Sequence, residues 1–269
     1  MARPSSKNGK GPNVASLAEA RFWTNRPEGM PGVDGVWRHV ESADPRERAL
    51  DIAERHFVPP DGCCDLIVRF DRGRFAGAFV QEPTLMAEVV SIGPLDALFG
   101  VRFAIGIGGA LLKRRERIAA EARGLFESAA PGDVSDVLER LLGFSADTVQ
   151  REAATPPSWL GEALALSQRC FGDVSVAALA AHVGLSERTL HRGFSDWVGA
   201  GPKQLLRTLR VREAARRASA GASLVDVATE LGFADQAHLS RELSALWGVS
   251  PGRLRGVSDS FKTGPAERA

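Results

Sequence analysis

The fold is decided by a stretch that the chain carries twice: Leu179-Ala180-Ala181-His182-Val183-Gly184-Leu185 and, 48 residues later, Val227-Ala228-Thr229-Glu230-Leu231-Gly232-Phe233. Beyond the glycine the second copy is one residue longer, and the offset becomes 49. Leu190 then matches Leu239, Arg192 matches Arg241 and Pro202 matches Pro251. Such self-similarity indicates two copies of one supersecondary unit.

Each copy predicts a helix-turn-helix. A short apolar helix, over 176–182 or 224–230, ends at a glycine, which closes a helix in the left-handed conformation without a Cβ penalty. An apolar residue then fills the corner, and Ser186 or Asp235 can cap a second helix. The second helix of such a unit can enter the major groove of DNA. The alternative is an α-hairpin inside an ordinary helical bundle, and two copies in register make it the less favoured interpretation.

A helix predicted over Pro202–Ala218 joins the two units, because proline suits the first turn of a helix. At a rise of about 1.5 Å per residue this helix spans roughly 25 Å. Together with the width of the units, that length can hold two exposed helices about 34 Å apart, which is one turn of the DNA duplex. One monomer would then occupy two successive major grooves.

The whole chain has 269 residues, enough for two domains with separate cores. Its 44% hydrophobic and 25% charged residues are typical of a globular protein and exclude a disordered or collagen-like chain. The pattern of predicted elements changes at Thr155-Pro156-Pro157-Ser158: almost all of the sequence after it is predicted to be helical. We therefore expect a disordered N-terminus (1–15), a β-rich sensor or dimerisation domain (16–154), a linker (155–159), a double helix-turn-helix domain (160–257) and a flexible tail (258–269).

The first half is rich in Phe, Val and Ile between residues 37 and 107, with turn residues at short intervals. Strands are predicted over 64–70, 75–81, 85–92 and 99–105, and helices over 112–126 and 134–142. The predicted fold class is α+β in two domains. The N-terminal domain is expected to be β-rich and barrel-like with flanking helices, and the C-terminal domain all-α, with two helix-turn-helix units joined by a helix.

Charge and cysteine content narrow the class of protein. The net charge of +1 excludes a histone-like polycation but allows one locally basic surface. The three cysteines, Cys63, Cys64 and Cys170, cannot form a disulfide framework and fit a reducing compartment. The longest stretch without a formal charge, 174–186, is shorter than the roughly 20 residues of a membrane-spanning helix. We expect a cytoplasmic protein that does not engage a membrane.

Two runs in the second half carry a family resemblance: Leu231-Gly232-Phe233-Ala234-Asp235-Gln236-Ala237-His238-Leu239-Ser240-Arg241 and Gly248-Val249-Ser250-Pro251. They resemble the C-terminal domain of the AraC/XylS family of bacterial transcription regulators. The resemblance extends over about 172–256 and includes both units and the helix between them. It implies a sequence-specific regulator that binds double-stranded promoter or operator DNA and is not an enzyme.

The resemblance places the residues that contact DNA on the second helix of each unit: Arg188, His191 and Arg192 in the first, and Gln236, Ala237, His238 and Arg241 in the second. Lys203 is a further candidate. Arginine can pair with guanine and glutamine with adenine, although each arginine could equally contact a phosphate. Leu190, Phe194, Leu239 and Leu243 are expected to face the core. Gly193 and Leu243 depart from the bulky residues usual in such helices, which bears on local stability.

The first half also carries a resemblance, in the run His56-Phe57-Val58-Pro59-Pro60-Asp61-Gly62-Cys63-Cys64-Asp65-Leu66-Ile67 and in Gly100-Val101-Arg102-Phe103. These runs resemble an uncharacterised, cupin-like domain often found ahead of this DNA-binding module. The resemblance implies a small-molecule effector or dimerisation, so the expected partners are DNA, an effector, a second copy in a homodimer, and RNA polymerase.

Arg69 and Arg102 lie on apolar strands, where an anionic ligand could compensate a buried charge. The alternative is that strand alternation turns both arginines to solvent. Neither a metal nor a cofactor is expected, because adjacent Cys63 and Cys64 on a strand would point to opposite faces.

Two other classes of protein remain as alternatives. One is a cupin-like small-molecule-binding or catalytic protein whose helical half serves as an interaction module. The other is a DNA-repair alkyltransferase that also regulates transcription, which would need a zinc-bound cysteine cluster that three cysteines do not provide.

Overall fold

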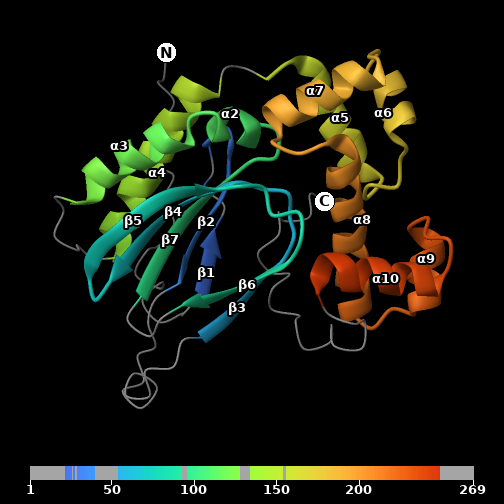
Figure 1. Ribbon diagram of the computed structural model, residues 1–269, viewed down its shortest axis with the longest axis horizontal. Helices are drawn as coiled ribbons and strands as arrows, with labels where there is room; N and C mark the ends of the chain where they lie inside the picture. The colour runs from blue at the N-terminus through green and yellow to red at the C-terminus, as the bar shows by residue number, and fades with distance from the viewer. Residues whose placement is uncertain are drawn as a thin grey trace, which may run out of the picture.

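The computed structural model describes residues 22–25, 27, 29–39, 54–92, 96–127, 134–153 and 156–248. A β-sheet covered by helices forms the first part of the chain, and helices alone form the part after Pro156 (Figure 1). The segments predicted as a disordered N-terminus and a flexible tail lie outside the described residues. Helix α5 begins at Ser158, inside the range predicted as a linker, and the division into domains stays a prediction.

The N-terminal sheet is antiparallel, with strands in the order β1-β2-β7-β4-β5. These strands are β1 (Phe22–Asn25), β2 (Val33–His39), β4 (Asp65–Asp71), β5 (Arg74–Gln81) and β7 (Asp96–Phe103). A separate two-stranded sheet consists of β3 (Glu54–Val58) and β6 (Glu88–Ile92). The strands predicted over 64–70 and 75–81 are therefore confirmed to within one residue at each end.

The expectation of a barrel-like domain was wrong, because the five-stranded sheet is open. A barrel needs its edge strands to pair with each other, and in the described part of the chain β1 and β5 each pair with one inner strand alone. The segment after β5 turns toward the helical half instead of continuing the sheet: the hydroxyl of Thr208 donates to the carbonyl of Leu85 at 3.2 Å. An alternating apolar pattern shows which face of a strand is buried, but not which strands are neighbours.

Three helices cover one face of the sheet: α2 (Gly108–Leu112), α3 (Arg115–Glu127) and α4 (Val134–Glu152) (Figure 1). The flanking helices predicted for this domain are confirmed. The core between sheet and helices includes Leu66, Val101 and Phe103 from the strands and Leu111 and Leu141 from the helices, all without exposed surface. Burial of each such side chain contributes about 1.5–3 kcal/mol.

The second part contains α5 (Ser158–Arg169), α6 (Val176–His182), α7 (Glu187–Trp197), α8 (Pro202–Ser219), α9 (Leu224–Glu230) and α10 (Gln236–Trp247). The short helices α6 and α9 match their predicted ranges residue for residue, and α8 is one residue longer than predicted. Two separate apolar cores lie along α8, one around Leu190 and Phe194 and the other around Leu239 and Trp247. Each repeated unit therefore packs around its own core.

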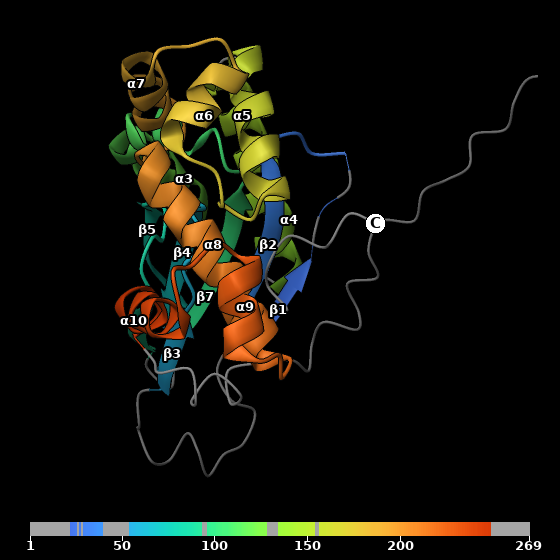
Figure 2. The same ribbon diagram turned by 90° about the vertical axis from the view of Figure 1, so that its right-hand side faces the viewer.

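The sheet domain makes polar contacts with α7, α8 and α10 of the second part. The backbone N–H of Ala87, just before β6, donates to the carbonyl of Leu246 near the end of α10 at 2.6 Å. The ammonium of Lys113 pairs with Asp196 near the end of α7 at 2.6 Å. Thr208 of α8 makes the contact with Leu85 described above. Figures 1 and 2 show the sheet domain lying along one side of α8.

We predict that Gly109→Ala disrupts the packing of α2 against the end of α7. A Cβ at Gly109 would lie 2.6 Å from the carbonyl oxygen of Asp196 and 2.8 Å from the nitrogen of Gly199. Such overpacking costs about 1–3 kcal/mol. The free energy of unfolding from urea titration of the full chain measures the effect. Gly124→Ala, in α3, is the matched control, because a Cβ there meets nothing within 4 Å and should stabilise the helix by about 0.5–1 kcal/mol. An equal effect of the two substitutions would contradict the close approach.

Candidate nucleic-acid interface

The two repeated units have the same local geometry. The turn after α6 passes through Gly184 with φ of 70°, and the turn after α9 passes through Gly232 with φ of 67°. In both turns the residue after the glycine donates its N–H back into the preceding helix at 2.9 Å, from Leu185 to Ala180 and from Phe233 to Ala228. This pattern satisfies carbonyls at the end of a helix that would otherwise lack a donor.

The second helix of each unit begins at a capping side chain. Ser186 accepts the N–H of Thr189 at 3.2 Å, and Asp235 accepts the N–H of His238 at 2.6 Å. Both caps were predicted from the repeat. A helix whose first turn is fixed in this way presents its exposed side chains at a defined rotation about its axis.

The buried faces of α7 and α10 confirm the sequence prediction. Leu190, Phe194, Leu239 and Leu243 have no exposed surface. The opposite faces carry the residues predicted to contact DNA. All of these residues are exposed except His238, which is partly buried: Arg188, His191 and Arg192 on α7, and Gln236, Ala237, His238 and Arg241 on α10. Lys203 in the first turn of α8 is exposed as well.

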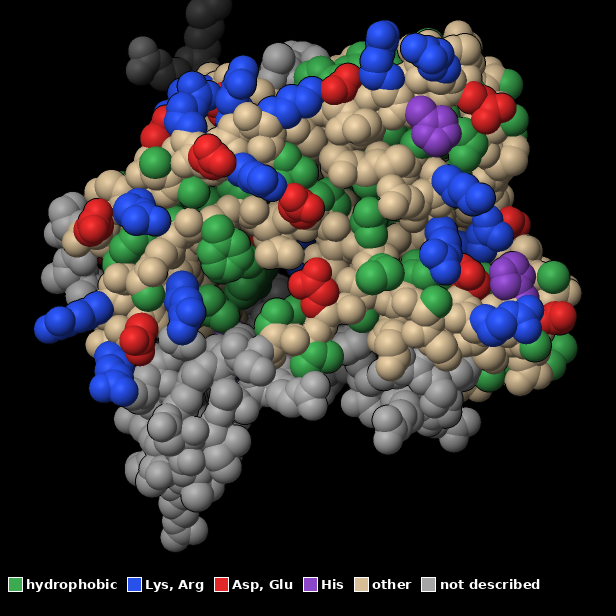
Figure 3. Space-filling model, in the orientation of Figure 1, with side chains coloured by type: hydrophobic (Ala, Val, Ile, Leu, Met, Phe, Trp, Pro, Cys, Tyr) green, Lys and Arg blue, Asp and Glu red, His purple; other side chains and the backbone are tan. Residues whose placement is uncertain are grey.

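Helices α7 and α10 lie near opposite ends of α8 (Figure 1), and in Figure 2 both lie on the same side of it. The space-filling view shows Lys, Arg and His side chains on the helical half, with Asp and Glu among them (Figure 3). The two helices that carry the predicted residues thus lie on one side of α8 in Figure 2.

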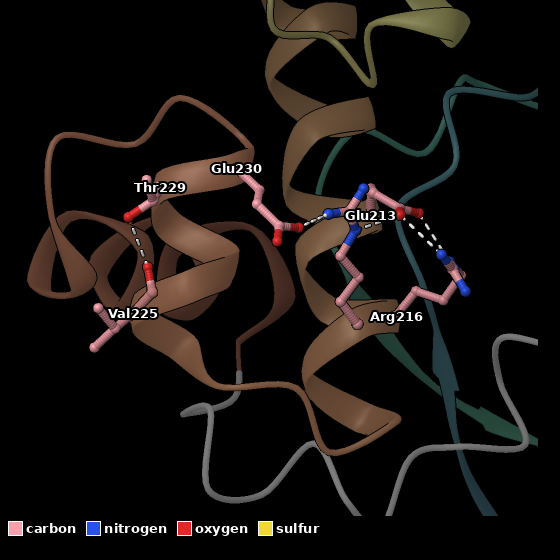
Figure 4. Close-up of polar contacts among 6 residues, drawn as sticks. Glu213, Arg216, Val225, Thr229 and Glu230 are labelled. Atoms are coloured by element: carbon pink, nitrogen blue, oxygen red, sulfur yellow. Dashed lines mark hydrogen bonds and ion pairs between the residues drawn. The ribbon is translucent and has the colours of Figure 1, made fainter.

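The arginines of the helical half fall into two groups. On α8, Arg207 makes a bidentate pair with Glu242 of α10 at 2.5 and 3.0 Å, and Arg216 pairs with Glu213 at 2.8 Å. Arg217 joins Glu213 to Glu230 of α9, whose side chain points toward α8 (Figure 4). In contrast, among the described residues no ion pair neutralises Arg188, Arg192 or Arg241. The second group keeps its charge available for an anionic partner.

The acids that pair with α8 have altered pKa values. Hydrogen bonds from Arg207 lower the pKa of Glu242, and this effect exceeds that of burial, which raises it. Burial also raises the pKa of Glu213, but the hydrogen bonds from Arg216 and Arg217 outweigh it and leave the pKa below its usual value. Both carboxylates therefore favour the charged form: Glu242 ties α10 to α8, and Glu213 orients Arg216 and Arg217 within α8.

Gly193 departs from the bulky residues of related helices for a local reason. A Cβ at Gly193 would lie 2.4 Å from the indole ring of Trp159 in α5. Glycine at this position lets α5 pack directly against α7, so the departure does not leave a cavity. Leu243, the second departure, is fully buried in the core of its unit.

The two arginines proposed for an anionic ligand differ in their surroundings. Arg69 on β4 is exposed, as the alternative of strand alternation predicts. Arg102 on β7 lies between two carboxylates of the chain itself, at 2.9 Å from Asp61 and 3.1 Å from Asp65. The indole N–H of Trp37 donates to the same Asp65 at 2.9 Å. The charge of Arg102 is therefore compensated without a ligand.

Burial and charge oppose each other in this cluster. Burial raises the pKa of Asp61, and the neighbouring Arg102 works against that shift. For Arg102, burial alone would lower the pKa, but Asp61 and Asp65 outweigh burial and raise it. From local sequence, Asp61 was expected only to form part of a turn. Its partner stands 41 positions further along the chain, and no local pattern reports such a pairing.

The metal-type residues of the N-terminal half do not assemble into a site within the described ranges, where no group of three or more His, Cys, Asp or Glu is placed to hold a metal ion. Cys63 and Cys64 were expected on a strand, but both precede β4, so strand alternation does not apply to them; both are buried. Burial raises the pKa of both thiols. The side chain of His56 lies outside the described part. In the described ranges, none of the helices combines the length and the apolar character needed to cross a membrane.

Comparison with known proteins bears on the helical half. Residues 179–256 match a family described as helix-turn-helix domain. The HTH-type transcriptional activator RhaS of Escherichia coli O139:H28 is 31% identical over 126 residues, which are 46% of this chain and 45% of that protein. The chain thus matches about half the length of this curated relative.

Solved structures give weaker similarities. A transcriptional regulator with an AraC-type DNA-binding domain from Chromobacterium violaceum is 25% identical, covering 37% of this chain and 91% of that one with a TM-score of 0.35. ToxT from Vibrio cholerae is 11% identical, covering 91% of this chain and 99% of that one with a TM-score of 0.41. At these TM-scores neither likeness carries functional weight.

Two capped units on one helix, together with the family match, define the helical half as a double helix-turn-helix domain. The matched residues include the runs around Phe233 and Arg241 on which the AraC/XylS resemblance rests.

We predict that Arg102→Met destabilises the protein by about 3–5 kcal/mol, because it leaves two buried carboxylates without their cation. Asp61→Asn should cost less, since it removes a buried charge while Asp65 still pairs with Arg102. Urea titration gives the free energy of unfolding of each variant. The control is Arg69→Met, an exposed change that should stay within about 0.5 kcal/mol. If Arg102→Met were no more costly than Arg69→Met, the cluster would not matter for stability.

Proposed function

We propose that the protein is a sequence-specific DNA-binding transcription regulator with no catalytic role, and that its N-terminal domain senses a small molecule or mediates dimerisation. The observation that carries the proposal is the pair of capped helices, α7 and α10, which expose arginines that form no ion pair with the described acids. The likeness to RhaS, named a transcriptional activator, supports the same function.

The length of α8 fits this role. Its 18 residues correspond to about 27 Å at a rise of roughly 1.5 Å per residue. Helix α7 packs against the first half of α8 and α10 against the second half, so their exposed faces suit two neighbouring major grooves, which follow each other every 34 Å or so.

Each exposed residue type has a matching chemistry on DNA. Arg188, Arg192 and Arg241 can donate two hydrogen bonds to the O6 and N7 of guanine, and Gln236 can pair with adenine. Ala237 offers a methyl contact to thymine, and His191 and His238 are further donors. Lys203 suits a phosphate, which would position the domain on the duplex without reading a base.

The contacts between the two halves support regulation by the N-terminal domain. The sheet domain touches α7 through Lys113, α8 through Leu85 and α10 through Ala87. An effector or a second copy bound to that domain would change which arrangement of the two units is populated. We include a small-molecule effector, a homodimer, RNA polymerase and a cytoplasmic location in the proposal as features expected of such a regulator.

Selection of bound fragments from random duplex DNA by the full chain tests the proposal. A regulator should enrich one sequence and hold it with a Kd of about 10⁻⁸–10⁻¹¹ M that weakens steeply with salt. Failure to enrich any sequence would favour the alternative, a cupin-like binding or catalytic protein whose helical half is an interaction module.

On the enriched duplex, we predict that Arg241→Ala costs about 1–3 kcal/mol of binding free energy and relaxes specificity at one base pair. Fluorescence anisotropy on a panel of single-base variants measures both effects. Arg216→Ala, which removes the same charge from α8 beside Glu213, should leave the specificity profile unchanged. A uniform loss across the panel would instead make Arg241 a phosphate contact.

A further inference from the structure

Arg210 joins the two repeated units. It lies in the middle of α8, and 25% of its side chain is exposed. Its Nη2 donates to the carbonyl of Gly172 at 3.1 Å, in the segment that leads into the first unit. Its Nη1 donates to the carbonyl of Gly232 at 3.5 Å, in the turn of the second unit, and lies 3.7 Å from the carboxylate of Asp173. One side chain thus binds the backbone of both units at once.

The surroundings of Arg210 leave little room for adjustment. A Cβ at Gly172 would lie 2.0 Å from the carbonyl oxygen of Leu206 in α8, and one at Gly232 would lie 2.4 Å from the carboxylate of Asp173. The segment before α6 therefore meets α8 backbone to backbone, and the turn after α9 meets the Asp173 carboxylate of that segment. A small change in the position of one of them has to be taken up by the other two.

The guanidinium of Arg210 is also connected, through Phe233, to the beginning of α10, the second helix of the second unit. It lies over the ring of Phe233, 5.7 Å from the centroid, and Phe233 packs edge to face against His238 at 5.5 Å. The Nδ1 of His238 accepts the N–H of Ala234 at 3.3 Å. This line of contacts runs from the first unit, through Arg210, to a residue in the first turn of α10.

We propose that Arg210 is a positioning residue that fixes the orientation of α10 relative to α7, and through it the separation of the two half-sites that the protein accepts. The proposal rests on the proposed function and adds to it the determinant of half-site spacing. An arginine is suited to this task because its planar fork offers several donors in fixed directions, which a lysine does not.

The test uses the full chain, the duplex enriched by selection, and versions of that duplex with one or two base pairs inserted between the half-sites. Wild-type protein should bind the one-pair insertion at least about tenfold more weakly than the parent duplex, because rigid units cannot follow the shifted groove. Arg210→Ala should bind the parent about tenfold more weakly than wild type does, and its penalty for the insertion should fall to about threefold or less.

Two further variants separate positioning from charge. Arg210→Lys keeps the charge and loses the fork, so it should tolerate the insertion as Arg210→Ala does. Arg216→Ala is the matched control on the same helix, because Arg216 pairs with Glu213 of α8 (Figure 4), and it should keep the wild-type penalty. If Arg210→Ala lost affinity equally on every duplex, or if Arg210→Lys restored wild-type behaviour, Arg210 would act through its charge and the proposal would be wrong.

A measurement without DNA tests the role of Arg210 independently of the proposed DNA-binding function. Amide hydrogen exchange of Arg210→Ala should rise in both turns, over 172–174 and over 232–234, and stay unchanged in α3. If wild-type protein enriches no duplex, the proposed function fails, and the exchange measurement alone decides whether Arg210 couples the two units. Faster exchange in both turns supports the coupling, and unchanged exchange in either turn overturns it.

Discussion

The structure of the helical half depends on the burial of α8 between two small apolar cores. Leu205, Leu206 and Leu209 belong to the first core, while Val211, Ala214, Ala215 and Ala218 belong to the second. Each unit alone is too small to bury enough apolar surface for independent stability. Because both share one continuous helix, neither can rotate about its axis without breaking its own core. The length of α8 therefore sets the separation between α7 and α10.

Charge is distributed in keeping with that arrangement. Glu230 and Glu242 pair with arginines of α8 and tie the second unit to the shared helix, while Glu213 of α8 itself holds Arg217 in place. The arginines of α7 and α10 are left for an outside partner. A net charge close to zero is thus compatible with a locally basic surface, because Glu213, Glu230 and Glu242 neutralise arginines of α8 and not those of α7 or α10. In the N-terminal domain, too, an arginine is neutralised within the chain: Arg102 pairs with two carboxylates, so its charge needs no ligand.

Much of the helical half followed from the sequence, and less of the sheet domain did. The repeat predicted α6, α9, both caps and the exposed faces, because each of these depends on residues within a few positions of one another. The sheet domain was expected to be barrel-like and is open, because strand pairing joins residues far apart in the chain. The cluster of Asp61, Asp65 and Arg102 was missed for the same reason. Arg69 and Arg102 stand on apolar strands alike, yet one is exposed and the other buried in an ion pair.

The sequence by itself determined the local elements of the repeated units: where α6, α8 and α9 begin and end to within a residue, and which side of α7 and α10 is apolar. These properties arise from capping, glycine turns and periodicity, all of which act over a single helical turn or two. Only the tertiary structure decided how Arg210 joins the two units, how α2 meets α7 at Gly109, and which arginines remain without acids. Such contacts are made by side chains and backbones from distant segments, and their geometry exists only once the segments have packed.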